Sequence, residues 1–238
     1  MIEIDQVLVR FGGVVALNAV SDRFTAPVGG IIGPNGAGKT TLMNVVSGFL
    51  TSKGGRVVVD GADILAQPPH KRAHLGLRRS FQKEQIADDL SVFENVLVQS
   101  DHRLGQAAAQ RAEVARMTDL VGLTDRAHQP GAMLTGFERR LTDVARCLVG
   151  APKLILFDEP AGGLSVEETH RLGDLILGIH ALTGAQTLVI DHDVELIARV
   201  CTETLVLDFG RRIAFGPTAD VLGDPIVKAA YLGTEEVT

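Results

Sequence analysis

The sequence predicts an α/β fold with a mixed, largely parallel central sheet, an antiparallel β part and a helical part. The first observation is that residues 33–40 match the phosphate-binding pattern G-x-x-x-x-G-K-[ST], between an apolar pair of residues and a helical repeat. The second is a continuous apolar run at residues 154–157, which is typical of a parallel strand covered on both faces. The third is the alternation of strand and helix patterns after residue 150, which predicts βαβ units.

Composition limits the classes of protein to which the chain can belong. The 238 residues carry a formal net charge of −6 and only 4% aromatic residues, so neither a phosphate-neutralising surface nor a base-stacking platform for nucleic acid is expected. No apolar run approaches the ~18 residues of a membrane span, and the first residues lack a signal-peptide pattern, so we expect a cytoplasmic protein. Cys147 and Cys201 fall on apolar helical stripes and predict buried, reduced thiols.

Residues 1–60 predict antiparallel strands wrapped around the phosphate loop and its helix. Residues 2–9 show apolar–polar alternation and predict a first strand, which a Gly-Gly pair then interrupts. Residues 14–24 contain a second strand, and residues 56–59 predict a further hairpin arm. The helix after the loop is indicated by apolar residues at the spacing i, i+3, i+4 and i+7, namely Leu42, Val45, Val46 and Phe49.

The loop itself is expected to hold the phosphates of a nucleotide. Its glycines let successive backbone N–H groups turn toward the phosphates, and the N-terminus of the following helix favours negative charge. Lys39 is expected to reach the β- and γ-phosphates, and the Thr40 hydroxyl to ligate Mg²⁺. The expected nucleotide contacts are Gly33, Pro34, Asn35, Gly36, Ala37, Gly38, Lys39, Thr40 and Thr41.

The middle of the chain predicts a mainly helical region. Residues 70–75 predict a short polar helix, and residues 77–81 return to a strand pattern. Ser91 and Glu94 form a capping box for a helix that continues to residue 99. Residues 106–121 predict another helix, so this region forms a helical lobe.

The last third of the chain alternates between strands and helices. Ser165 and Glu168 form a capping box for a helix after the apolar run. Asp193 suits the N-cap of the helix after the next strand. The later elements are expected at residues 187–190 (strand), 193–201 (helix), 204–207 (strand) and 212–215 (strand).

Polar residues at strand ends supply candidate chemistry. Asp158 and Glu159 follow the apolar run, where an α/β sheet places its ligands. Asp158 suits the outer sphere or direct ligation of the Mg²⁺ that Thr40 holds, and Glu159 suits orienting and deprotonating a water in line with the γ-phosphate. The alternative for this pair is two solvated turn acids. His192 either bonds the γ-phosphate or is structural, and Gln82 either touches the metal's water or is an ordinary loop residue.

The order and spacing of five elements resemble the nucleotide-binding subunit of ATP-binding cassette (ABC) transporters, across essentially the whole chain. These elements are the phosphate loop, Gln82, residues 134–138, residues 154–159 and His192. The match is specific because five separated elements must coincide. The resemblance implies that the chain binds ATP and Mg²⁺ and hydrolyses ATP, with the catalytic residues Glu159, His192 and Lys39.

The resemblance also implies an architecture and further contacts. It implies a single ABC ATPase domain with a P-loop, RecA-like core and an antiparallel β subdomain at residues 1–85 and 150–238, and a helical lobe at about 86–149. Phe11 would stack on adenine, the alternative being a core aromatic residue beside a turn. Mg²⁺ would be held by Thr40, Gln82 and Asp158. The signature of the lobe would contact a partner's ATP in trans through Thr135, Gly136, Phe137 and Glu138.

Within the family, four segments look like the branched-chain amino acid import ATPases, at residues 10–13, 77–82, 90–96 and 230–233. Lipopolysaccharide-export ATPases and urea or amide importers are also similar. The implied partners are a second ABC ATPase subunit, identical or different, transmembrane permease subunits and a solute-binding protein. The implied location is the inner face of the cell membrane, where the chain is held by the permease.

Three departures from the family pattern matter. Phe137 stands where a glycine is usual, which keeps open a nucleotide-binding regulatory module with little turnover. Ser165 replaces the usual Asp or Asn, and residues 27–32 form a shorter approach to the phosphate loop, which leaves open a truncated or rearranged strand. ABC ATPases of DNA repair carry long insertions that the chain lacks between residues 41 and 133, and a P-loop kinase would need an acceptor site and lid arginines.

Overall fold

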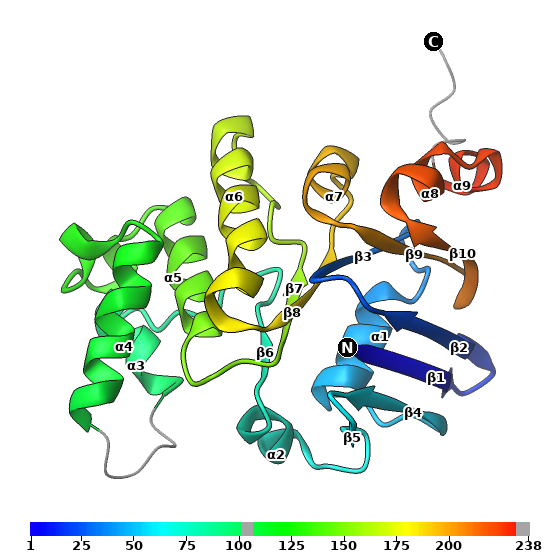
Figure 1. Ribbon diagram of the computed structural model, residues 1–238, viewed down its shortest axis with the longest axis horizontal. Helices are drawn as coiled ribbons and strands as arrows, with labels where there is room; N and C mark the ends of the chain where they lie inside the picture. The colour runs from blue at the N-terminus through cyan, green and yellow to red at the C-terminus, as the bar shows by residue number, and fades with distance from the viewer. Residues whose placement is uncertain (101–106, 232–238) are drawn as a thin grey trace.

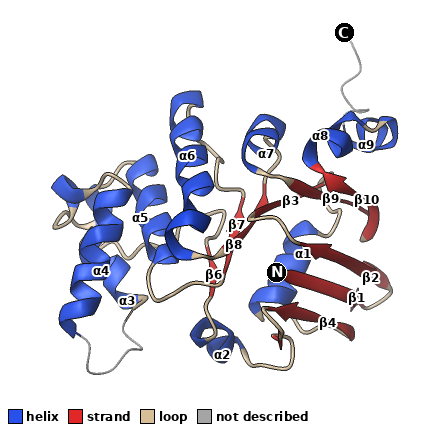
Figure 2. Ribbon diagram, viewed as in Figure 1, coloured by secondary structure: helices blue, strands red, loops and turns tan. Residues whose placement is uncertain are grey.

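The computed structural model describes residues 1–100 and 107–231, and over these residues the chain forms two sheets and a set of helices (Figure 2). The predicted α/β class is therefore confirmed. Residues 232–233 of the family-like segment near the C-terminus lie outside the described residues.

The first sheet is antiparallel and comes from the N-terminal part of the chain. Its strand order over the described residues is β2-β1-β4-β5. The strands are β1 (Ile2–Phe11), β2 (Val14–Phe24), β4 (Gly54–Val59) and β5 (Ala62–Asp63). The predicted hairpins at residues 2–24 and 56–59 are confirmed, and irregularities in the register of β1 and β2 bend this pair.

The second sheet is mixed and carries the order β10-β9-β3-β8-β7-β6 within the part of the chain that the structure describes. Its strands are β3 (Val28–Ile32), β6 (Leu77–Arg79), β7 (Leu154–Asp158), β8 (Gln186–Ile190), β9 (Glu203–Asp208) and β10 (Arg211–Pro217). All neighbouring pairs are parallel except β9 with β10. β3 is fully buried and pairs with both β8 and β9, so the residues before the phosphate loop form a regular five-residue strand inside the sheet.

Most helices begin and end within one or two residues of the predicted positions. They are α1 (Lys39–Ser47), α2 (Pro69–His74), α3 (Val92–Val98), α4 (Ala107–Leu120), α5 (Gly136–Leu148), α6 (Val166–Thr183), α7 (Val194–Val200), α8 (Thr218–Gly223) and α9 (Pro225–Tyr231). The capping boxes of α3 and α6 and the Asp193 cap of α7 are confirmed. Among the described residues, no helix combines the length and apolar character needed to cross a membrane.

One helical prediction is wrong. The stripe after the phosphate loop was expected to include Phe49, but α1 ends at Ser47 and Gly48 follows in the left-handed conformation, with φ at 89°. Gly48 donates its N–H to the carbonyls of Asn44 and Val45, which closes the helix. Phe49 therefore lies outside the helix, and 69% of it is exposed.

Two hydrophobic cores lie on the two faces of the mixed sheet. The apolar side chains of α1 pack between the antiparallel sheet and one face of the mixed sheet, where Leu154 and Leu156 point. Ile155 and Phe157 point to the other face, into the core that includes α3 to α7. Figure 1 shows α3, α4 and α5 on one side of the molecule and β1, β2 and β4 on the other. The central sheet therefore separates a β-rich part from a helical part.

The two cysteines belong to these interiors. Cys147 and Cys201 are free and buried, as predicted. Burial raises the pKa of the Cys201 thiol to about 12 and also raises the pKa of Cys147, because a thiolate is poorly solvated there. Both residues are therefore packing groups.

The close approach of neighbours to β3 gives a test of the fold. A Cβ at Gly29 would lie 2.8 Å from Cε1 of Phe24 and 2.9 Å from Cδ2 of Leu188. We expect Gly29→Ala to lower the free energy of unfolding in urea by about 1–3 kcal/mol, because the core is already filled. Gly178→Ala is the control, since nothing lies within 4 Å of its added Cβ, and the helix should gain up to about 1 kcal/mol. Equal changes in the free energy of unfolding for Gly29→Ala and Gly178→Ala would contradict the close packing of Phe24 and Leu188 against β3.

Candidate functional site

The phosphate loop connects the buried strand β3 to helix α1 and is fixed by close backbone contacts. Gly33, Gly36 and Gly38 have φ values of 147°, 80° and 105°, which favour glycine. A Cβ at Gly33 would collide with the carbonyl of Leu207, and one at Gly38 would lie 2.7 Å from the carbonyl oxygen of Ala16. The glycines therefore let the loop lie against neighbouring strands, in addition to leaving its N–H groups accessible.

Lys39 is folded onto its own loop. Its Nζ donates hydrogen bonds to the carbonyls of Gly33, at 2.6 Å, and Pro34, at 3.0 Å. Burial lowers the pKa of Lys39, and the negative charges of Glu159 and Asp158 act in the opposite direction. The ammonium group therefore lies in the loop, close enough to Asp158 and Glu159 to interact electrostatically with them.

The two members of the acid pair have different partners. Asp158, the last residue of β7, is buried and accepts a hydrogen bond at 2.7 Å from Nη2 of Arg79. Glu159 accepts a hydrogen bond at 2.6 Å from Nε2 of Gln82, and its own N–H donates to the carbonyl of Ile190. The pair is thus not two solvated turn acids.

Glu159 also has an unusual backbone. Its φ is +49°, which is uncommon for a residue with a side chain. Such strain concentrates at functional sites, because surrounding contacts must hold it in place. Here the bond from the Glu159 N–H to the Ile190 carbonyl, at 2.7 Å, supplies one such contact.

A buried carboxylate next to His192 organises two loops. Asp191 is fully buried and accepts hydrogen bonds from the backbone N–H groups of Ala161, at 3.1 Å, and Asp193, at 2.9 Å. It therefore joins the loop after β8 to the loop after β7. His192 extends outward with a side chain 69% exposed, and its Nδ1 lies 3.6 Å from Oδ1 of Asp191. No motif indicated a role for Asp191, although an acidic residue directly after a buried strand is a usable signal.

The topology explains why these groups meet. β3, β8 and β7 are neighbours and parallel, so the loops that follow them emerge at one edge of the sheet. That edge carries the phosphate loop, the acid pair and His192, and Gln82 reaches it from beyond β6. Thr40 is exposed at the start of α1. Phe11 belongs to the antiparallel sheet, where it pairs with Val14, and its 52% exposure argues against a core role.

The predicted signature residues are placed elsewhere. Thr135 caps α5, with its Oγ1 accepting from the N–H of Glu138 while the Glu138 carboxylate accepts from the N–H of Thr135. These bonds lower the pKa of Glu138. Phe137 packs against the helical core, and the guanidinium of Arg171 lies 5.4 Å from its ring centroid. α5 lies with α3 and α4 in the helical part (Figure 1). Thr135, Phe137 and Glu138 line a hollow together with residues of α6 and residues of the segment 122–126, and not with the phosphate loop.

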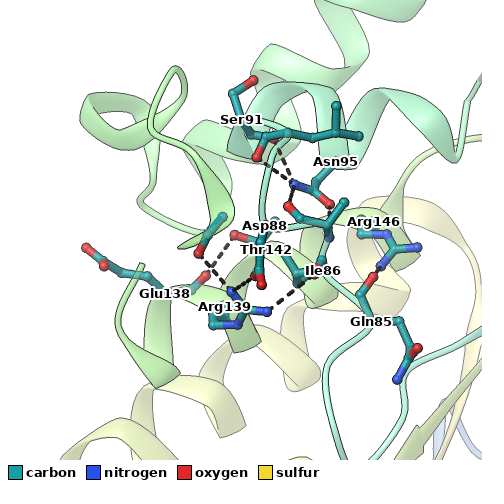
Figure 3. A network of polar contacts seen from close by, with 12 residues as sticks. Gln85, Ile86, Asp88, Ser91, Asn95, Glu138, Arg139, Thr142 and Arg146 are labelled. Atoms are coloured by element: carbon teal, nitrogen blue, oxygen red, sulfur yellow. Dashed lines mark hydrogen bonds and ion pairs between the residues drawn. The ribbon is translucent and has the colours of Figure 1, made fainter. Parts of the chain in front are cut away.

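Arginines of α5 hold the irregular segment that carries Gln82. Arg139, Arg140 and Arg146 each donate to backbone carbonyls of this segment. Figure 3 shows Arg139 beside Ile86 and Asp88, with which it pairs at 2.8 Å, and Arg146 beside Gln85. The accepting carbonyls belong to Phe81, Gln82, Gln85 and Ile86. The backbone position of Gln82 is therefore set by α5, the helix that Thr135 caps. Nothing in the sequence pattern indicated this connection.

The donor groups at the sheet edge suit a hard cation bound together with phosphates. Within residues 1–100 and 107–231, no group of three or more His, Cys, Asp or Glu side chains gathers as a metal cage. The hydroxyl of Thr40, the amide of Gln82 and the carboxylate of Asp158 offer oxygen ligands. Mg²⁺ prefers oxygen ligands and commonly uses one or two carboxylates plus the phosphates of its substrate and water.

Comparisons with known proteins agree with this geometry. A family profile described as ABC transporter matches residues 25–162. The chain is 32% identical over 249 residues to the high-affinity branched-chain amino acid transport ATP-binding protein BraF of Pseudomonas aeruginosa, covering 98% of each chain. It is 34% identical over 207 residues to the lipopolysaccharide export system ATP-binding protein LptB of Haemophilus influenzae, covering 87% of this chain and 86% of that one. The solved ADP conformation of MJ1267, an ATP-binding cassette of an ABC transporter, superposes with a TM-score of 0.86 at 28% identity, covering 98% of each chain.

The contacts of Arg140 give a test of how Gln82 is held. Arg140 is 1% exposed, donates to the Phe81 and Gln82 carbonyls at 3.0 and 2.9 Å, and pairs with Glu84 at 2.8 Å. Lysine cannot reproduce the planar fork that reaches both carbonyls. We expect Arg140→Lys to speed amide hydrogen exchange at residues 81–86 at least several-fold.

The control is Arg126→Lys, which alters an exposed ion pair at the start of the same helix. Exposed pairs contribute little, so this variant should exchange like the wild type. Unchanged exchange at residues 81–86 in Arg140→Lys would contradict the role of Arg140 in holding the backbone of Phe81 and Gln82.

Proposed function

Because the chain belongs to the ABC transporter family, as an ATP-binding and ATP-hydrolysing subunit, we propose that it energises the import of branched-chain amino acids or related small polar solutes. The observation that carries the proposal is the meeting of the phosphate loop, Glu159 and His192 at one edge of the mixed sheet. The substrate class is supported by similarity to BraF along nearly the whole chain.

The residues of the site suggest how ATP is bound and hydrolysed. The loop N–H groups and Lys39 bind the β- and γ-phosphates, for which Lys39 gives up its bonds to the loop carbonyls. Thr40, Asp158 and the amide of Gln82 would hold Mg²⁺, which would supply positive charge beside the transferring phosphoryl group. Glu159 orients the attacking water and accepts its proton, and His192 bonds the γ-phosphate. Phe11 stacks on the adenine ring.

Gln82 contacts the candidate base through its side chain and α5 through its backbone. Its Nε2 donates to one oxygen of the Glu159 carboxylate, Oε2, which leaves the second oxygen to accept a proton from water. Because Arg140 of α5 binds the carbonyls of Phe81 and Gln82, we propose that a shift of α5 relative to the mixed sheet alters the hydrogen bond between Gln82 and Glu159.

The site of one chain is incomplete, and we propose that a second ATPase subunit completes it. Thr135, Gly136, Phe137 and Glu138 are apart from the phosphate loop of their own chain, so they contact the ATP that the partner holds. Each chain would then contribute its phosphate loop to one ATP site and its signature residues to the other, in one closed pair of subunits. The partner is an identical chain or a related ATPase.

A groove offers the surface for membrane partners. It has a volume of about 260 Å³ and lies where the end of α1, β6 and α5 meet, with Phe49, Arg79, Phe81 and Arg146 among its lining. We call it the α1–α5 groove. Phe49 is 69% exposed, and an exposed aromatic residue beside a groove is typical of a binding surface. A permease segment would bind there and hold the chain on the inner face of the membrane, with a solute-binding protein supplying the solute.

A lipopolysaccharide-type exporter is the second candidate. The specific observation is the 34% identity to LptB, over a smaller share of the chain than the match to BraF. Importers of urea or amides fit the same site. A regulatory module with little turnover is the remaining alternative, because Phe137 places a Cβ where the partner's phosphate would approach.

Replacing Glu159 tests hydrolysis. We expect Glu159→Gln to lower ATP turnover about 10²–10⁴-fold while ATP binding is kept, because glutamine cannot accept the proton. The measurement is phosphate release by the purified protein or its transporter complex. Glu167→Gln is the control, since Glu167 is exposed in the first turn of α6. Wild-type turnover in Glu159→Gln would remove Glu159 from its assigned role.

A further inference from the structure

We propose that Arg79 holds the carboxylate of Asp158 in competition with the metal and links the α1–α5 groove to the end of β7 that carries Asp158. The inference rests on the proposed function, in which Asp158 and Thr40 hold Mg²⁺ beside ATP. It adds a residue to which neither the sequence motifs nor the proposed chemistry assigned a role. Its consequence is that the affinity of the site for Mg²⁺ depends on where the Arg79 guanidinium lies.

The strand register explains how Arg79 reaches Asp158. Arg79 pairs with Leu156 in the parallel ladder of β6 and β7, so the two side chains point to the same face of the sheet. Asp158 lies two residues beyond Leu156 and points to that face as well. The long arginine side chain spans the remaining distance to the carboxylate, with Nη2 at 2.7 Å from Oδ2.

The ion pair is shielded from water. The side chains of Arg79 and Asp158 are only 6% and 7% exposed. A buried ion pair is weakly screened, and removing one partner leaves the other charge without compensation. The guanidinium therefore sets both the orientation and the effective charge of the Asp158 carboxylate.

The same guanidinium also binds α1. Its Nη1 donates to Oδ1 of Asn44 and to Oγ of Ser47, each at 2.7 Å. α1 begins with Lys39 and Thr40, so Arg79 joins the helix that presents Thr40 to the strand that presents Asp158. The relative position of the two expected metal ligands therefore depends on one side chain.

Two aromatic rings connect Arg79 to the groove. The guanidinium lies 4.7 Å from the centroid of Phe81 and 5.7 Å from that of Phe49, and the rings pack edge to face at 5.6 Å. All three residues line the α1–α5 groove. A segment that binds in the groove must press on these rings or compete for the guanidinium. Either event changes the hold of Arg79 on Asp158.

The direction of the effect follows from charge. Arg79 and Mg²⁺ are both cations that draw on the carboxylate of Asp158, so they compete for it. Without Arg79 the carboxylate keeps its full charge for the metal. We therefore expect loss of Arg79 to strengthen Mg²⁺-dependent nucleotide binding and to leave metal-free nucleotide binding nearly unchanged.

The experiment measures binding of a fluorescent ATP analogue in EDTA and across a Mg²⁺ titration. Mg²⁺ is expected to enhance binding of the analogue, and Arg79→Met should lower the Mg²⁺ concentration that gives half of this enhancement at least threefold. The affinity for the analogue in EDTA should stay within twofold of the wild-type affinity. Arg79→Lys keeps the charge and should give a midpoint near that of wild type. Arg199→Met is the matched control, because Arg199 pairs with Asp174 at 2.6 Å, on α6. A midpoint that is unchanged or higher in Arg79→Met overturns the proposal.

A second measurement does not depend on metal or nucleotide. Thermal unfolding is compared for Arg79→Met, Asp158→Asn and the double variant, because removing one partner of a buried pair can prevent folding. We expect the double variant to melt at a higher temperature than Arg79→Met alone. If the loss of melting temperature in the double variant equals the sum of the losses in the two single variants, the proposal is overturned. Failure of the wild type to bind the analogue contradicts the proposed function instead, and the melting comparison still tests Arg79.

Discussion

The parallel pairing of β3 with β8 and β9 is the constraint on which the site depends. β3 is fully buried, and side chains of its neighbours occupy the space that a Cβ at Gly29 would need. The phosphate loop that follows is fixed by backbone contacts, such as the hydrogen bond of 2.9 Å from the Gly210 N–H to the Ala37 carbonyl. Because β8 and β7 continue the same parallel sheet, their polar ends meet this loop. The nucleotide site is thus a consequence of strand order.

The polar groups at this edge have partners within the chain. Nζ of Lys39 donates to loop carbonyls, Asp158 pairs with Arg79, and Glu159 accepts a hydrogen bond from Gln82. A buried charge without a partner is costly, so binding of Mg²⁺ and ATP would exchange these contacts for contacts with the phosphates and the metal. Arg79 lines the α1–α5 groove, and the backbone of Gln82 is held by Arg140 of α5. This arrangement explains how events on the helical side can reach the phosphates.

The sequence predicted those features that depend on local chemistry. Capping boxes and apolar runs are short-range signals, so the strands and most helix ends were predicted well. The prediction that Phe49 belongs to α1 is wrong because the apolar spacing alone does not show that Gly48 ends the helix in the left-handed conformation. The contacts of Arg79 and Arg140 could not be predicted, since they join residues 79 with 158 and 140 with 82. Such contacts exist only once strand register and helix packing are fixed.

The most direct test of the account is a structure of the Glu159→Gln variant with Mg²⁺ and ATP. The account predicts that Nζ of Lys39 has left the carbonyls of Gly33 and Pro34 and contacts the β- and γ-phosphates. It also predicts that the side chain of residue 82 no longer bonds residue 159. A nucleotide bound away from the phosphate loop, or Lys39 still bonded to the loop carbonyls beside bound ATP, would contradict it.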